Sequence, residues 1–173
     1  MSTVIDGSAS VTINSGAVLG ITSGTAVAST SGTSIDFNSI PSWCKRLTVM
    51  FNGVSTNGAS NLQLQIGAGS VTTTGYSGGV SQAGSSSTQI TLTTGLGVTA
   101  SNSAALLSTG LCVFTLVGSN LWVGVSTTSR SDGFGQVGGT ALTLGGTLDR
   151  VRITTVNGTD TFDAGTINIM YEG

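Results

Sequence analysis

Few residues of this 173-residue chain carry side chains that could do chemistry. Histidine is absent, which excludes Ser-His-Asp triads, Cys-His pairs and histidine-ligated metals. Asp160 and Asp163 form a pair of carboxylates that could serve a glycosidase as acid and base. The same spacing is typical of a turn capped by aspartates, so a glycan hydrolase is only a remote alternative. We therefore expect a protein that is not an enzyme.

The remaining polar motifs point to no metal and no other cofactor. The spacing of oxygen ligands in an EF-hand loop does not occur. Cys44 and Cys112 could form one disulfide if the fold brings them together. Because the N-terminal residues do not read as a secretory signal, we expect two buried, reduced thiols instead. For the same reason Asn157-Gly158 indicates a hairpin turn rather than a glycosylation site.

Basic residues are too few for a nucleic-acid-binding surface, since Lys and Arg together number five. Two of them, Arg150 and Arg152, follow Asp149 and point the same way if they lie on a strand. Such a group is either a local ion-pair cluster on an exposed strand face or part of a subunit interface. Both interpretations remain open from the sequence.

The composition favours a protein that assembles with copies of itself. Charged residues make up 7% of the chain, against about 25% in an ordinary globular protein. The net charge of −2 gives little repulsion between copies. A monomer with a surface rich in Ser and Thr is the alternative. No apolar run approaches the roughly 20 residues of a membrane-spanning helix, so we expect no membrane insertion.

The elements that must position these residues read as β-strands from Ser34 onward. Apolar and polar residues alternate in several segments, which predicts strands with one buried face. The clearest alternation covers 47–52, 62–66, 90–93, 150–154 and 166–171. Asn-Gly and Asp-Gly pairs at 52–53, 57–58, 132–133 and 157–158 predict tight turns, and 111–125 predicts a hairpin. The expected fold is an all-β antiparallel sandwich of about eight strands, jelly-roll-like.

The first 33 residues differ from the rest, because large apolar residues are sparse among Ser, Thr, Gly and Ala. This composition predicts an extended N-terminal arm over 1–33 that is ordered only when it lies against something else. The sandwich domain is expected over 34–173. The arm could anchor the chain to a larger particle by adding strands to a partner protein.

Two segments rich in Gly, Ser and Thr, 67–88 and 126–140, are expected to be surface loops. They carry two aromatic residues, Tyr76 and Phe134, together with Gln136. Ring faces and amides can contact a sugar or a neighbouring subunit, which makes these three residues the candidate contact residues. The alternative is that the rings cover the edge of the core.

Two stretches resemble a known family. They are 34–55 (SIDFNSIPSWCKRLTVMFNGVS) and 148–165 (LDRVRITT followed by NGTDTFDAG). Together they resemble a β-rich domain that recurs in tail-fibre and other virion proteins of tailed bacteriophages. The resemblance extends over 34–173 and carries no catalytic residue with it.

The resemblance implies a non-enzymatic virion structural protein of the tail-fibre or surface-knob type. It further implies a homotrimer on the virion surface. Because the N-terminal residues do not read as a secretory signal, we expect the chain to be made in the host cytoplasm. Other virion proteins, reached through the arm, and host surface glycans are the expected partners. Because only a short arm precedes the domain here, a capsid decoration (cement) protein that stabilises the phage head is the alternative.

Overall fold

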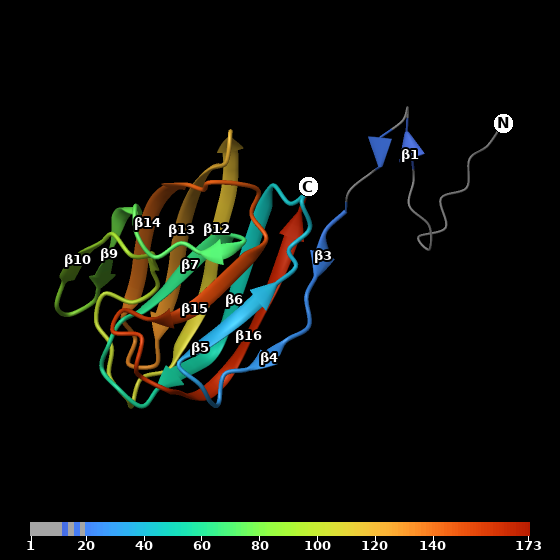
Figure 1. Ribbon diagram of the computed structural model, residues 1–173. Helices are drawn as coiled ribbons and strands as arrows, with labels where there is room; N and C mark the ends of the chain where they lie inside the picture. Colours follow the sequence, from blue (N-terminus) through green and yellow to red (C-terminus); the bar gives the residue numbers. More distant parts are fainter. Residues whose placement is uncertain (1–11, 14–15, 18–19) are drawn as a thin grey trace.

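The computed structural model describes residues 12–13, 16–17 and 20–173. In these residues the fold is all β, and two antiparallel sheets stack face to face (Figure 1). The predicted β-sandwich is therefore confirmed. The described part of the chain has no helix long and apolar enough to cross a membrane.

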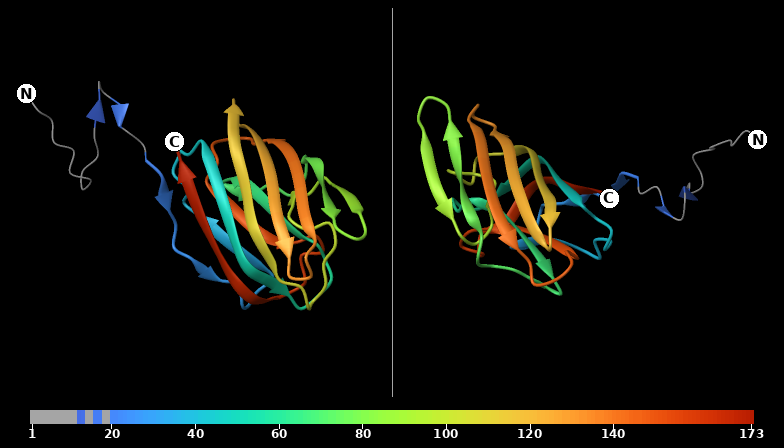
Figure 2. Two further views of the ribbon diagram at one scale, coloured as in Figure 1. Left: turned by 180° about the vertical axis from the view of Figure 1, so that it is seen from behind. Right: turned by 90° about the horizontal axis from the view of Figure 1, so that it is seen from above.

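The larger sheet holds most of the long strands. Its order is β10 (Thr88–Leu92), β9 (Ser77–Ala83), β14 (Gly135–Thr143), β13 (Leu121–Arg130), β12 (Ser108–Gly118), β6 (Arg46–Thr56), β16 (Phe162–Glu172) and β3 (Thr22–Ser23). A further short strand, β4 (Val27–Ala28), also pairs with β16. Figure 2 shows this sheet from behind in its left view and the two layers from above in its right view.

The smaller sheet lies in front of the larger one in Figure 1. Its order is β11 (Leu96–Gly97), β7 (Leu62–Ala68), β15 (Arg150–Thr155) and β5 (Ser34–Asn38), and β8 (Ser70–Val71) pairs with β7. Separately, β1 (Thr12–Ile13) pairs with β2 (Gly16–Ala17). The described strands thus outnumber the eight or so expected, chiefly because six of them contain only two residues each.

The strand pairing is nested, as when one long hairpin is folded over on itself. Successive pairs are β6 with β16, β7 with β15, β9 with β14, and β12 with β13. This winding is the jelly-roll-like feature that the sequence predicted. The innermost hairpin, β12–β13, stays in the larger sheet between β14 and β6 and makes that sheet much the wider of the two.

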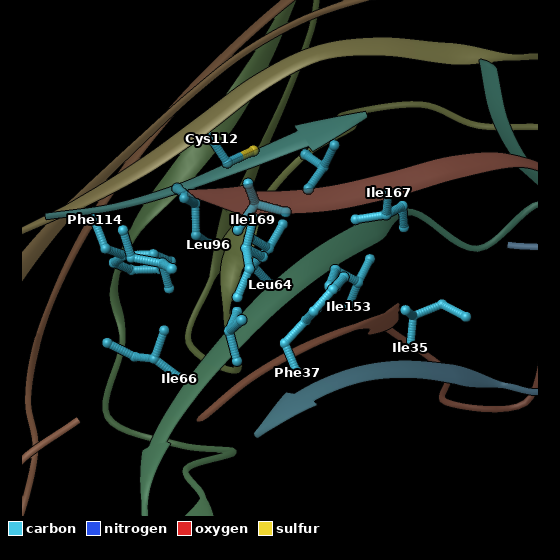
Figure 3. Close-up of a cluster of buried hydrophobic side chains, with 14 of the residues drawn as sticks. Ile35, Phe37, Leu64, Ile66, Leu96, Cys112, Phe114, Ile153, Ile167 and Ile169 are labelled. Carbon is cyan, nitrogen blue, oxygen red and sulfur yellow. The ribbon is translucent and has the colours of Figure 1, made fainter. Parts of the chain in front are cut away.

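The core lies between the sheets because each long strand buries alternate residues. Strand β6 contributes Leu47 and Val49, and β7 opposes them with Leu64 and Ile66. Figure 3 shows side chains from both sheets packed between the layers, among them Phe114 and Leu64. Full burial of a large apolar side chain contributes roughly 1.5–3 kcal/mol, so this shared layer accounts for most of the stabilisation.

The predicted turns are correct in part. Ser119 and Asn120, with φ of 48° and 62°, close the β12–β13 hairpin in the left-handed region that such turns require. Gly133 and Gly158 also have positive φ and lie between strands. The turn expected at Asn52-Gly53 is wrong, because Gly53 lies inside β6, where positive φ accompanies irregular pairing with β16.

Part of the predicted arm, residues 20–33, lies within the described residues and packs against the sandwich. From Gly20 onward the chain runs along the edge of the larger sheet, and its β3 and β4 pair with β16. The N–H groups of Gly24 and Ser29 donate to the carbonyls of Ile169 and Gly165 at 2.8 and 3.0 Å. Residues 20–33 therefore cover an edge strand of the sandwich, while most of the earlier arm lies outside the described residues.

Candidate functional site

Two of the three candidate contact residues are buried, and their prediction as glycan contacts is wrong. Tyr76 is 2% exposed and Gln136 is fully buried. The hydroxyl of Tyr76 accepts a hydrogen bond from the N–H of Ile66 at 2.8 Å and donates to the carbonyl of Thr72 at 3.0 Å. The side-chain carbonyl of Gln136 accepts from the N–H of Ala100 at 2.8 Å. Both side chains satisfy backbone groups from other segments, which the local sequence does not reveal.

Phe134 is half-buried and covers a polar cluster. Its ring lies 5.0 Å from the guanidinium carbon of Arg130, which donates to Gln82 at 2.6 Å and pairs with Asp132. The hydrogen bond from Arg130 holds the pKa of Asp132 below its usual range. This cluster ties β13 to β9, and a contact of Phe134 with a ligand stays a prediction.

Arg150 and Arg152 lie on the outer face of β15, as the period of two predicts. Arg150 pairs with its neighbour Asp149 at 2.7 Å, and this hydrogen bond lowers the pKa of that carboxyl. Arg152 instead makes two hydrogen bonds to Asp36 on β5, at 2.7 and 2.9 Å. Nothing in the sequence signals this second partner. A role of either arginine in a subunit interface stays a prediction.

The carboxylates considered for hydrolysis make structural hydrogen bonds. Asp160 accepts from the N–H of Ser60 at 2.9 Å and from the side-chain amide of Asn157 at 2.7 Å. Asp163 accepts from the hydroxyl of Ser55. Over the described residues, no three His, Cys, Asp or Glu side chains gather where they could hold a metal ion.

The two cysteines are free thiols in the structure, and both are buried. Cys112 is fully buried in the core, and burial raises the pKa of its thiol. Burial also raises the pKa of Cys44. Both thiols are therefore protonated at neutral pH and pack as small apolar side chains.

A polar pocket of about 240 Å³ opens on the outer face of the smaller sheet. Its floor is set by strand register, because Arg152 lies opposite Gln65 of β7, and Thr154 lies between Ser34 of β5 and Gln63 of β7. We call it the β15 pocket. It is lined by Thr33, Ser34, Gln63, Gln65, Thr73, Arg152 and residues 154–158.

Several polar groups of the β15 pocket are held in place by the protein. The amide N–H of Gln65 donates to the carbonyl of Thr94 at 2.9 Å, and Gln63 accepts from the hydroxyl of Thr94 at 2.7 Å. The hydroxyl of Thr154 donates to the carbonyl of Thr33 at 2.9 Å. Oε1 of Gln65 and Nη1 of Arg152 are among the lining groups that make no hydrogen bond to a described residue.

The outer face of the larger sheet exposes apolar side chains on neighbouring strands. The register places Val113 opposite Val125 and Thr127 opposite Val137. We call this surface the apolar face and define it by Leu111, Val113, Val123, Val125 and Val137. Four of these side chains are 41–60% exposed, and Val113 is half-buried.

No charged residue belongs to the three strands of the apolar face, except Arg130 at the end of β13, whose side chain is buried. Arg46 and Glu172 lie on the two strands beyond, where they pair with each other at 3.8 Å. The surface is therefore apolar and neutral across its middle. The sequence carried a signal for it, since the segment 111–117 is apolar at every position except Thr115.

No family model matches the chain, and no curated protein or solved structure is similar enough to count as a match.

Proposed function

We propose that this chain is a non-enzymatic structural protein of the bacteriophage virion surface, of the tail-fibre or surface-knob type, and that it assembles with copies of itself. The resemblance of 34–55 and 148–165 supports the virion role. The observation that carries the self-association is the apolar face. The proposed assembly is a homotrimer in which each copy covers the apolar face of a neighbour.

The exposed side chains of the apolar face are neighbours on adjacent strands and not single residues scattered over the surface. Isolated exposed valines are normal on soluble proteins, but a contiguous apolar surface of several hundred Å² usually marks an interaction site. Val123 and Val125 lie on the central strand β13, with Leu111 and Val137 on the strands at either side. Removing such surface from water contributes roughly 25 cal/mol per Å², from which the entropic cost of association is subtracted.

A second copy of the chain fits this surface better than a charged partner does. The apolar face offers no charge with which an acidic or basic protein could pair. Two copies, each with a net charge of −2, repel each other weakly. A neutral, apolar surface can pack against a neutral surface of another copy, and in a closed ring of three copies the two surfaces that meet at each interface differ.

The experiment is light scattering of the full chain at micromolar concentration, with two matched variants. We expect three chain masses for the unmodified protein. Val125→Asp buries a charge in the proposed interface and should give monomers. Val156→Asp introduces the same charge at a valine that is 42% exposed but lies at the smaller sheet, and it should leave the trimer intact.

Two results would contradict the proposal. One is an unmodified chain that stays monomeric throughout this range. The other is a trimer that Val156→Asp dissociates and Val125→Asp does not, because the interface would then lie on the smaller sheet.

A further inference from the structure

We infer that the β15 pocket binds one uncharged sugar residue through its hydroxyl groups. The inference deepens the proposed function and rests on it for the source of the sugar, a neutral glycan on the host surface. The binding itself is a property of the isolated chain, so it can be tested separately.

The free hydrogen-bonding groups of the pocket match a pair of adjacent hydroxyls. Arg152 and Gln65 face each other across β15 and β7. Arg152 has Nη1 left to donate after its two hydrogen bonds to Asp36. Gln65 has Oε1 left to accept after its amide N–H is used by Thr94. A sugar hydroxyl donates one hydrogen bond and accepts another, so neighbouring hydroxyls can satisfy both groups.

Charge in the pocket favours a neutral ligand over an anion. Arg152 is the one charged side chain that lines the pocket, as far as the structure describes the chain. Its charge is compensated by the bidentate pair with Asp36. A phosphate or carboxylate would have to displace Asp36 or be repelled by it, whereas a hydroxyl can use Nη1 while the pair stays in place.

The key side chains are held before any ligand arrives. Gln65 is only 6% exposed, and its amide is fixed by the carbonyl of Thr94. Its Oε1 has no partner among the described residues, yet it is not sealed from solvent. Arg152 is fixed by two hydrogen bonds to one carboxylate. Because little side-chain freedom remains to be lost, a small ligand binds at a lower entropic cost.

The size and walls of the pocket suit a single ring. Its volume of about 240 Å³ lies below the range of about 300–1,000 Å³ for sites that take drug-sized ligands. One wall is the turn from Val156 to Gly158, and Thr73 contributes another lining group. Val156 is 42% exposed and offers an apolar contact for the C–H face of a sugar ring.

The test is an NMR titration of the full chain with single probes. The probes are the methyl glycosides of glucose, galactose, mannose and rhamnose, with inorganic phosphate as the anionic probe. We expect at least one glycoside to shift the amide signals of Gln65, Arg152 and Val156 at millimolar concentration. Phosphate should leave the same signals in place.

Arg150 supplies a matched control for the central residue of the pocket. It lies two positions before Arg152 on the same face and pairs with an aspartate at the same distance of 2.7 Å, but it does not line the pocket. Arg152→Gln should weaken glycoside binding at least tenfold, and Arg150→Gln should change it less than twofold. Arg152→Lys keeps the charge beside Asp36 but loses the forked donor, so it tests the same point if Arg152→Gln does not fold.

Three results would overturn the inference. The first is that none of the four glycosides shifts the pocket signals at 100 mM. The second is phosphate binding to the same amides more tightly than any glycoside, which would make the pocket an anion site. The third is equal loss of binding in the Arg150 and Arg152 variants. Light scattering of the same samples tests the proposed assembly separately. A trimer that binds no sugar would contradict sugar binding by the β15 pocket but not the proposed assembly.

Discussion

The hydroxyl of Tyr76 joins a loop to the smaller sheet, because it accepts a 2.8 Å hydrogen bond from the N–H of Ile66 on β7. The same hydroxyl donates to the carbonyl of Thr72 in the loop that follows β8. Thr73, the next residue, lines the β15 pocket. One buried phenol therefore fixes the position of a pocket wall, and of the two roles that the sequence left open, a surface contact or a place in the core, Tyr76 has the second.

Replacing Tyr76 with Phe should destabilise the protein without disturbing the core packing. The ring stays, but the N–H of Ile66 loses its partner. An unsatisfied buried donor costs about 1–3 kcal/mol, and each kcal/mol lowers Tm by about 2–4 °C for a chain of this size. Tyr171→Phe is the control, since no hydrogen bond joins that hydroxyl to a described residue. Equal melting temperatures for the two variants would contradict the assigned role.

Gly124 should tolerate no side chain, although its strand is regular. A Cβ there would lie 2.6 Å from a ring carbon of Phe114 in the core. Overpacking of this kind typically costs about 1–3 kcal/mol. At Gly139, on the neighbouring strand, the nearest atom to an added Cβ is 3.8 Å away, so Gly139→Ala is the control. Urea unfolding at one protein concentration should place the midpoint of Gly124→Ala clearly below that of Gly139→Ala.

Truncation of the N-terminal segment should have two different effects. Removing residues 1–19 should leave Tm nearly unchanged, because the pairing with β16 begins at Thr22. Removing 1–33 should lower Tm by several degrees, because it exposes the edge of β16 and removes the buried Ser29, whose hydroxyl donates to Ala164 at 2.8 Å.

Virion incorporation of the two truncated chains tests the proposed anchor. If attachment to other virion proteins depends on residues before Gly20, the chain lacking 1–19 should fold yet fail to enter particles. Normal incorporation of that chain would rule out an anchor in those residues. A chain lacking 1–33 that melts at the same temperature as the full chain would contradict the structural role of the edge pairing.

Below about pH 8, stability should change with pH only on the acid side. Hydrogen bonds from Arg130 and Arg150 lower the folded-state pKa of Asp132 and Asp149. A lowered folded-state pKa stabilises the protein above the unfolded value of about 3.9, and this stabilisation is lost as pH falls through the folded-state pKa. Because the chain has no histidine, we expect a flat Tm between about pH 5 and 8 and a decline below about pH 4.

The variant Arg150→Gln tests the cause of this decline of Tm at acid pH. Without the guanidinium, the pKa of Asp149 should rise toward its usual value, and the decline of Tm below about pH 4 should become shallower. A steep change in Tm between about pH 5 and 8 would show that some other group titrates on unfolding.

The alternation of residues made the fold class predictable from the sequence. Segments such as 62–66 and 150–154 place apolar side chains on one face, and the structure buries those faces in the core. Tight hairpins were predictable where the turn residues connect successive strands, as at Ser119-Asn120. The turn predicted at Asn52-Gly53 is wrong because this dipeptide also suits a residue with positive φ inside a strand.

The candidate site was predictable only in its local part. The period of two placed Arg150 and Arg152 on one face, and it placed Gln63 and Gln65 on another. These side chains come together because β15 pairs with β5 and with β7 in the same sheet. Both pairings join residues far apart in the chain. Asp36, the partner of Arg152, is separated from it by 116 positions, and no local pattern encodes such a contact.

The pairing of β3 and β4 with β16 determines how the sandwich responds to mechanical load. Hydrogen bonds in an antiparallel ladder lie perpendicular to the strands. Tension applied ahead of Thr22 along the axis of β16 therefore loads the bonds of Gly24 and Ser29 in shear, and they must break together. Tension applied sideways opens them one after another. A particle that holds this protein by its N-terminal end thus gains a joint that resists stretching along the sheet and peels when it is bent.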